Sequence, residues 1–443
     1  MAFQISPGVN VSEIDLTTVV PSVLTTAGAL AGYLPWGPAQ KLYTLTDEVS
    51  MVNRFAPQGP DANSAVTFFT ASSFLAYGNN LQFVRTVGAN GFNATAGAGS
   101  LQVLNSDIFQ YNYLVPGNGN TSGAFIARYP GALGNSIQVD VFDSSNTTLF
   151  STATFTSGGV TRNWNTLVNG APGTSSYVAA QAGSNDEFHV IVSDAGGLIT
   201  GTKGTILEIY PFISKASDAA VNGSSNYYKQ VIFNNSIYIQ AMDAVDYANT
   251  HTTWGQVAGG LTYGRIQNTT TGAVTIALSH GTDDVGTDAN ITNGYSLFTN
   301  KDTVDISLVL TAGADVTVQQ YVIDNIVTTR TDCVAFLSPP QSAVVNQAGN
   351  EVSNITTWLG QLQRSTSYAV VDSGWKYMYD KYNQTYRWIP LNGDIAGLCV
   401  YTDTVRDPWF SPAGFNRGAI KNAIKLAWNP NRSEEHTSEL QSH

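Results

Sequence analysis

The sequence predicts an α+β multidomain protein in which a discontinuous α/β core domain carries one or two β-rich inserted domains. Helix-period and strand-period patterns alternate over residues 24–88 and again over residues 315–431, which is typical of an α/β layer. Between them, residues 89–314 are rich in Gly, Ser, Thr and Asn, with short alternations of Val and Ile that predict β-strands. A length of 443 residues is enough for several domains.

The charge balance and the apolar pattern exclude some classes of partner. Only 12% of the residues are charged and the formal net charge is −12, so no nucleic-acid partner is expected. No apolar run reaches transmembrane length and no signal peptide opens the chain, so we expect no direct membrane insertion. Cys333 and Cys399 lie in apolar patterns, which favours two reduced, buried thiols over a disulfide or a metal pair.

The first half of the core is predicted from five short segments. Small apolar residues indicate a buried strand, and Thr46, Asp47 and Glu48 give a helix start signal. In order, we expect a strand over 25–33, a strand over 42–45, a helix over 46–55, a helix over 63–77 and a strand over 81–87.

The middle region contains three clean alternations of apolar and polar residues, over 136–142, 188–192 and 274–278. Each predicts a half-buried strand, and we expect one short helix over 238–247. The second half of the core then resumes the earlier pattern. We expect a helix over 316–328, a strand over 333–337, a helix over 352–363 and a strand over 368–371.

Residues 392–428 contain two helix-period patterns around an unusual loop. Asp394 stands at an N-cap position before Ile395, Leu398, Cys399 and Thr402, which follow helical spacing. A second helix is predicted from the same spacing of Ile420, Ala423, Ile424 and Ala427.

Residues 407–414 form the loop between these two predicted helices. Two prolines and a glycine prevent a helix there, whereas the large side chains of Trp409 and Phe410 demand burial. A rigid aromatic loop of this kind suits docking onto another surface.

Both ends of the chain stand apart from these patterns. Residues 1–23 alternate weakly at Val9, Val11, Ile14 and Leu16, which fits either a frayed terminus or an arm that adds a strand to a neighbouring molecule. Residues 432–443 are similar to a translated sequencing adapter, so we interpret them as non-native and expect the natural C-terminus to be missing. The segment that should cover Ile420, Ile424 and Trp428 would then be missing too, leaving these side chains more exposed.

No catalytic motif emerges from the sequence. P-loop, HExxH, CxxC and GxSxG patterns are missing, and we interpret His189, His251 and His280, far apart in the β-rich region, as structural or surface residues. We therefore expect no enzymatic activity, no catalytic residue, no cofactor and no metal.

Two acidic groups leave alternatives open. Asp283, Asp284 and Asp288 lie in one loop that suits a solvated Asx turn better than a calcium site. Asp372 and Asp380 flank a cluster of aromatic residues, an arrangement that is also found in sugar-hydrolysing sites.

Several segments together resemble contractile phage tail sheath proteins. Each motif is weak alone, but their number and order over residues 1–432 make the resemblance specific. They are SPGVNVSEID at 6–15, AGYLPWGP at 31–38, ARYPGALGN at 127–135, GTILE at 204–208, Tyr227 with Tyr228, DSGWK at 372–376 and NGDIAG at 392–397.

The resemblance implies a structural subunit that polymerises as a helical tube around the tail tube and contracts to drive that tube through the host envelope. It implies contacts with further copies of the chain, the tail tube protein, and baseplate and tail terminator proteins. It also implies a place in the virion after assembly in the host cytoplasm. The sheath of a phage-derived injection system is one alternative, and a β-rich carbohydrate-binding or hydrolytic protein is another.

In such a sheath the β-rich region would face outward and basic residues near the C-terminus would face the tube or a neighbour. The alternative for these residues is a solvated surface. The expected inner-face residues are Arg406, Trp409, Phe410, Arg417, Lys421 and Lys425.

Overall fold

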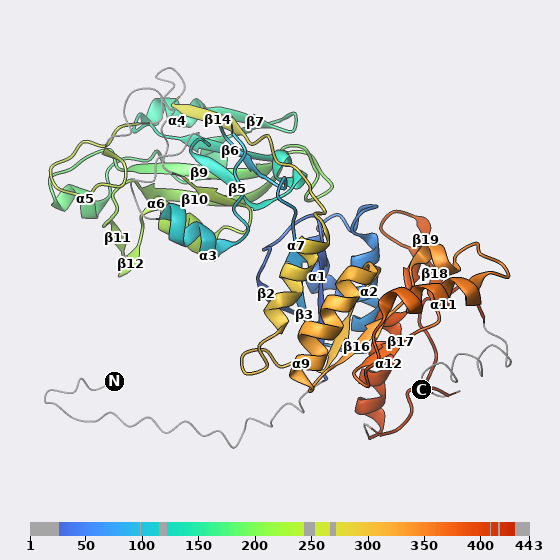
Figure 1. Cartoon of the computed structure of the whole chain (residues 1–443). Coiled ribbons are helices and arrows are strands. Elements are labelled where there is room, and N and C mark those ends of the chain that lie inside the picture. Colours follow the sequence, from blue (N-terminus) through green and yellow to red (C-terminus); the bar gives the residue numbers. More distant parts are fainter. Residues whose placement is uncertain are drawn as a thin grey trace, which may run out of the picture.

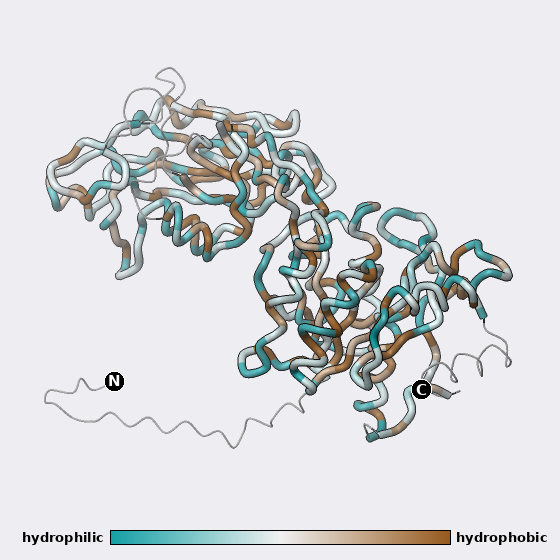
Figure 2. Tube along the Cα trace, in the orientation of Figure 1, coloured by the Kyte–Doolittle hydropathy of each residue, from teal (hydrophilic) through white to brown (hydrophobic). Residues whose placement is uncertain are grey.

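The computed structural model describes residues 26–97, 99–114, 122–242, 253–265, 272–407, 409–414 and 417–429. These residues form an α/β part and a β-rich part that lie side by side (Figure 1). In both parts hydrophobic residues concentrate along the central strands (Figure 2). No helix among these residues has the length and apolarity needed to cross a membrane.

The α/β part is built on a six-stranded sheet with the order β17-β16-β15-β1-β3-β2. Its strands are β1 (Gly28–Tyr33), β2 (Leu42–Leu45), β3 (Leu81–Thr86), β15 (Leu308–Leu310), β16 (Val334–Leu337) and β17 (Ala369–Val371). All neighbouring pairs are parallel except β2 with β3. Strand β1 is therefore flanked by segments from both halves of the chain.

Helices cover both faces of this sheet. On one face lie α1 (Glu48–Phe55), α2 (Ala65–Leu75) and α12 (Asn392–Val405). On the other face lie α7 (Asp288–Tyr295), α8 (Val316–Tyr321), which continues through a π-helical turn (Val322–Val327) into α9 (Thr328–Arg330), and α11 (Glu351–Leu362). The short α10 (Gln341–Val344) follows β16, and a 3-10 turn (Ser296–Phe298) follows α7.

Alternation along the strands assigns side chains to these two layers. Leu30 and Phe83 pack beneath α2, whereas Ala31 and Val84 pack beneath α7 and α8. The predicted start of α1 is confirmed, because Asp47 accepts a hydrogen bond from the Ser50 backbone N–H at 2.7 Å and closes a capping box.

Two packed sheets form the β-rich part. One has the order β10-β9-β6-β14 and the other β13-β5-β4, and side chains of both build a single hydrophobic cluster. The strands are β4 (Asn93–Thr95), β5 (Phe125–Pro130), β6 (Ile137–Phe142), β9 (Glu187–Asp194), β10 (Thr205–Ser214), β13 (Ile239–Ala241) and β14 (Ala273–Ala277).

Smaller elements decorate these sheets. Two hairpins are β7 (Thr154–Ser157) with β8 (Val160–Asn163), and β11 (Ala220–Val221) with β12 (Ser224–Ser225). The helices are α3 (Ser106–Phe109) with a π-helical turn (Gln110–Leu114), α4 (Thr147–Thr152), α5 (Ser176–Ala180) and α6 (Tyr228–Asn235), and 3-10 turns span Ala132–Ser136 and Trp164–Thr166.

Three elements differ from those predicted from the sequence. Residues 288–310 were expected in the β-rich region, but α7 packs on β1 and β3, and β15 pairs with β1. Their polar composition concealed the few apolar side chains that enter the core. The helix expected over 238–247 is wrong where the structure describes it, because residues 239–241 form strand β13 on β5.

The helix expected over 420–427 is also wrong. This segment is extended and forms β20 (Lys425–Leu426), because its backbone N–H groups bond to carbonyls of β18 (Trp375–Asp380). Helix α12 begins at Asn392, so Asp394 lies inside its first turn and is not the N-cap. Cys333 is buried, Cys399 is half-buried, and both are free thiols.

Arg85 joins the two parts. Its side chain is 1% exposed and donates hydrogen bonds to the carbonyl oxygens of Leu34, Pro35 and Gly37 at 2.5, 3.1 and 2.8 Å. A fourth bond, of 2.8 Å, reaches the carbonyl of Pro130 at the end of β5. Burial lowers the pKa of Arg85 to about 10, so the guanidinium remains charged at neutral pH.

Further contacts brace the same joint. The ring of Trp36 meets that of Tyr129 edge to face at 5.5 Å. The Asp283 carboxylate accepts the Ala132 N–H at 3.0 Å, and the Asp284 carbonyl accepts the Gly88 N–H at 2.9 Å. Asp284 Oδ1 also accepts the Gly286 N–H at 2.9 Å, which is the Asx-turn geometry expected for this loop.

The Arg85→Met variant tests this joint. It leaves four buried carbonyls without their donor, so we expect the free energy of unfolding to fall by roughly 3 kcal/mol in urea titrations. The matched control Arg364→Met removes a guanidinium from the half-exposed pair with Asp324 and should leave the urea midpoint near the wild-type value. Equal midpoints for all three proteins would contradict the role of Arg85.

His189 is held as a neutral imidazole within the β-rich part. It is fully buried, its Nδ1 accepts the Phe212 N–H at 3.0 Å, and its Nε2 therefore donates to the Gly170 carbonyl at 2.9 Å. Burial lowers the pKa of His189 to about 4. Protonation of Nδ1 would break the bond from Phe212.

We expect the wild type to lose stability relative to His189→Gln as the pH falls from about 6.5 to about 4, by up to about 3 kcal/mol. In the unfolded chain His189 is protonated near its ordinary pKa of 6.5, whereas in the folded chain it stays neutral until the pH approaches 4. Burial raises the pKa of Asp140 to about 6, so protonation of Asp140 stabilises the folded chain as the pH falls. Because this effect opposes that of His189, the wild type must be compared with the variant. Urea titrations of both proteins across this range should diverge, and parallel curves would contradict the account.

Candidate subunit-contact surface

A three-stranded antiparallel sheet with the order β19-β18-β20 lies beside the helices of the α/β part. It comprises β18, β19 (Thr385–Pro390) and β20. On β18 the side chains of Lys376, Met378 and Asp380 are buried, whereas Tyr377 and Tyr379 are increasingly exposed along the opposite face. The sheet thus has one face toward the core and one largely open.

Lys376 organises the buried face. Its Nζ lies 2.8 Å from each carboxylate oxygen of Asp394, and Oδ1 has the geometry of a hydrogen bond. Nζ also donates to Ser73 Oγ and to the Lys421 carbonyl, each at 3.0 Å. Burial raises the pKa of Asp394, and the charge of Lys376 opposes that shift. A buried ion pair therefore connects α2, β18 and α12 to the C-terminal segment 417–429.

Segment 417–429 is held mainly by backbone bonds. The hydroxyl of Tyr77 accepts the Lys421 N–H at 2.7 Å and donates to the Ala419 carbonyl at 3.1 Å. The N–H groups of Ile424 and Ala427 bond to the carbonyls of β18 at 2.8 and 2.7 Å. Ile424 is 58% exposed, which matches the exposure expected for it, whereas Ile420 and Trp428 are half-buried.

Lys421 and Lys425, both expected at the inner face, lie on this segment and are exposed. The Lys421 Nζ stands 4.4 Å from the centre of the Tyr77 ring and donates to the Ala76 carbonyl at 2.5 Å. The Lys425 Nζ lies 5.1 Å from the Tyr377 ring and 5.5 Å from the Trp388 ring. Both ammonium groups are therefore held against aromatic rings and still reach solvent.

The aromatic loop brings three other predicted residues together. The rings of Trp409 and Phe410 lie 6.1 Å apart, and the Arg417 guanidinium lies 5.7 Å from the Phe410 ring. Trp409 is 77% and Phe410 41% exposed, so the single chain does not bury these two side chains itself. Arg406, at the end of α12, is also exposed. A large exposed aromatic pair is typical of an interaction surface.

The two sheets of the α/β part end in unpaired strands among the described residues. Strand β17 is the last strand of the six-stranded sheet, and its Val370 and Val371 are each 40% exposed. Strand β19 is the last strand of the smaller sheet, where Tyr386 is 52% exposed and stacks on Tyr377 at 5.4 Å. Such edges offer backbone groups to an incoming strand.

The acidic pair considered for hydrolysis has structural partners. Asp372 Oδ2 accepts the Ser338 hydroxyl at 2.6 Å, and burial raises the pKa of Asp372 to about 7. Asp380 accepts hydrogen bonds from Asn383 and from the Arg387 guanidinium, the latter at 2.6 Å. Each carboxylate thus fixes a strand end.

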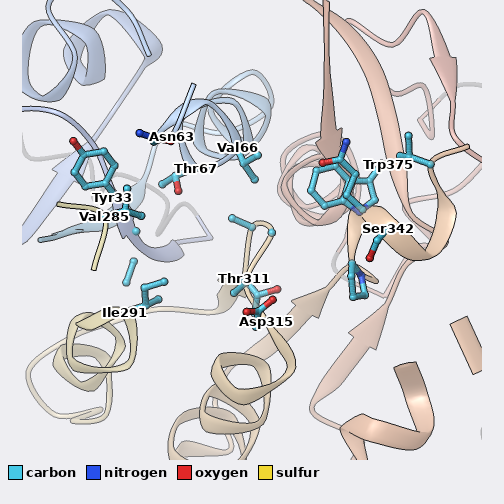
Figure 3. A pocket seen from close by; sticks show the side chains of 18 of the residues that line it. Tyr33, Asn63, Val66, Thr67, Val285, Ile291, Thr311, Asp315, Ser342 and Trp375 are labelled. Atoms are coloured by element: carbon cyan, nitrogen blue, oxygen red, sulfur yellow. The ribbon is translucent and has the colours of Figure 1, made fainter. Parts of the chain in front are cut away.

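A hollow of about 700 Å³ lies at the carboxyl ends of β1 and β15 (Figure 3). Side chains of Asn63, just before α2, and of Thr67, in its first turn, face it, with Thr311 and Asp315 following β15. This is where the strand order of an open α/β sheet reverses and where such sheets often bind ligands. Among the described residues of its lining, Asp315 supplies the one carboxylate.

The sequence singled out the exposed aromatic and basic residues of the candidate surface, but not the buried residues that hold them in place. The arm residues Val9, Val11, Ile14 and Leu16, and also His251, lie outside the described residues. Tyr77, Lys376 and the Asp394 ion pair were not predicted as partners. The sequence did carry one signal for this ion pair. In the alternation of β18, Lys376 falls on the buried face, and a charged residue on a buried strand face requires a partner.

Over nearly its whole length the chain is similar to the tail sheath proteins of three phages. The tail sheath protein of Vibrio phage KVP40 is 28% identical, with 96% of this chain and 77% of the relative aligned. Those of Enterobacteria phage T4 and Salmonella phage ViI are 27% and 25% identical, covering 96% and 98% of this chain and 76% and 75% of the relatives. No protein-family model matches the chain.

Two solved sheath tail proteins also match the chain, at low sequence identity. The protein from Listeria innocua gives a TM-score of 0.47 at 10% identity, covering 95% of this chain and 64% of that chain. The protein from Desulfitobacterium hafniense gives 0.42 at 11% identity, covering 99% and 70%. The similarity to tail sheath proteins therefore rests on the three sequence matches.

The Lys376→Met variant tests the support of segment 417–429. It leaves Asp394 buried without its counter-ion, so we expect a loss of roughly 3–5 kcal/mol in the free energy of unfolding. We also expect faster hydrogen exchange at the amides of Lys421, Ile424 and Ala427. The control Lys381→Met, in a partly exposed pair with Glu48, should leave these amides unchanged. Unaltered exchange in Lys376→Met would contradict the proposed support.

Proposed function

We propose that this protein is the structural subunit of a contractile phage tail sheath, which polymerises as a helical tube around the tail tube and drives it through the host envelope. The observation that carries this proposal is the similarity to three tail sheath proteins over at least 96% of the chain. Its partners are further copies of itself, the tail tube protein, and baseplate and tail terminator proteins. It acts in the virion after assembly in the host cytoplasm.

The α/β part would be the core domain near the tube, and the β-rich part an inserted domain facing outward. The six-stranded sheet combines residues 28–86 with residues 308–371, which supports a discontinuous core. The four hydrogen bonds of the buried Arg85 guanidinium resist bending between the two parts. This supports a contraction in which the α/β part and the β-rich part of a subunit move together.

The inner face would include Arg406, Trp409, Phe410, Arg417, Lys421 and Lys425. Residues 409–429 contain three basic residues and no Asp or Glu, although the chain has a net charge of −12. A basic, aromatic surface on an acidic protein suits an acidic partner surface. Exposed ion pairs contribute only about 0–1 kcal/mol each, so a lattice can exchange them during contraction.

Strand addition would connect neighbouring subunits. Residues 1–23, with Val9, Val11, Ile14 and Leu16, would supply a strand to a free edge such as β17 or β19 of another copy. Backbone hydrogen bonds of this kind can persist while the subunits rotate around them.

Negative-stain electron microscopy of the concentrated full-length protein, with both terminal arms intact, tests this function. We expect tubes of regular diameter in the wild type and in Tyr111→Ser, which removes an aromatic residue that is 86% exposed in the β-rich part. We expect the double variant Trp409→Ser, Phe410→Ser to keep its fold by circular dichroism and to form fewer tubes by at least about tenfold, the equivalent of 1.4 kcal/mol per contact. A full-length wild type that remains monomeric at high concentration with both arms intact would contradict the proposal.

A further inference from the structure

A cluster of three buried charged residues lies in the β-rich part, away from the proposed contact surface. Lys215, Asp143 and Asp186 are each 0% exposed. Asp143 directly follows β6 and Lys215 directly follows β10, and these two strands flank β9. Lys215 and Asp143 therefore lie on either side of the start of β9, and Asp186 directly precedes that strand.

The amine and the Asp143 carboxylate are in contact. Lys215 Nζ lies 2.7 Å from Asp143 Oδ1 and 3.0 Å from the Asn185 carbonyl oxygen. Its remaining surroundings include the rings of Phe188 and Trp254, whose centres lie 5.7 and 5.1 Å away. Burial lowers the pKa of Lys215, which favours the neutral, nucleophilic amine.

The second carboxylate completes the group. Asp186 accepts hydrogen bonds from Ser175 and Ser214, with oxygen–oxygen distances of 2.8 and 2.6 Å, so its position is fixed. Its charge acts on Lys215. Asp186 therefore adds a second, fixed negative charge beside the reacting pair.

We propose that Lys215 and Asp143 form an intramolecular isopeptide bond that staples β6 to β10. One proton passes from the Lys215 ammonium group to the Asp143 carboxylate, and the neutral Nζ then attacks Cγ. The new N–C bond forms, the Cγ–O bond breaks, and the leaving hydroxyl takes a second proton from Nζ and departs as water. The step needs no oxidant and no co-reactant. The reacting groups are held together in a site away from bulk water, which gives an intramolecular reaction its advantage over hydrolysis.

A second buried lysine provides an internal comparison. Lys376 Nζ lies equally close to Asp394, but it has three oxygen acceptors: Asp394 Oδ1, Ser73 Oγ and the Lys421 carbonyl. Three acceptors match the three protons of an ammonium group, which keeps this pair ionic. Only one bond per chain is therefore proposed, and it does not rest on the function proposed above.

Mass spectrometry of the denatured full chain tests the bond. We expect an intact mass lower than that of the sequence by one water. Trypsin should fail to cleave after Lys215 and should release residues 129–162 joined to residues 204–229. Asp143→Ala and Lys215→Met should show the full mass of their sequences. Lys41→Met, which removes an equally short but exposed pair with Asp107, should keep the deficit.

An intact wild-type mass equal to that of the sequence, or cleavage after Lys215, would overturn the proposal and leave the pair as a salt bridge. A deficit that persists in Asp143→Ala would overturn the assignment of the acid. Because the wild type itself is measured, poor folding of a variant does not obscure the result.

Discussion

The pairing of β1 on both sides is the constraint on which the rest of the structure depends. Gly28 is in register with Leu81 of β3 on one side and with Leu308 of β15 on the other. Because all three strands are parallel, the chain leaves β3 at its carboxyl end and must cross the sheet to reach the amino end of β15, and α7 makes that crossing. The Gly88 N–H bonds to the Asp284 carbonyl where the β-rich part begins and ends, and Arg85 ties the end of β3 to the end of β5 there.

Much of the α/β part followed from local pattern. Strands β1, β2 and β3 and helices α1, α2 and α11 were predicted because each carries its own period or capping signal. Strand β15 was missed because three residues are too short for a period and its neighbours are polar. Segment 420–427 has helical spacing but becomes extended because the carbonyls of β18 and the hydroxyl of Tyr77 take its N–H groups. Such long-range partners leave no mark in the local sequence.

At the candidate surface, too, some features were predictable from the local sequence and others depended on long-range contacts. Trp409, Phe410 and the basic residues could be singled out because they are unusual in an acidic, polar chain. The exposure of these residues depends on the tertiary structure, and so does the position of Lys421 against Tyr77, just after α2, and of Lys425 against rings of β18 and β19. A buried ion pair holds this segment from within, so its outer face is free for contacts without loss of internal support.

A reconstruction of assembled tubes by cryo-electron microscopy tests the account most directly. The account predicts that the α/β part, with Trp409, Phe410 and Lys425, lines the inner wall and that the β-rich part projects outward. Tubes with the β-rich part on the inner wall, or a concentrated chain without helical order, would contradict it.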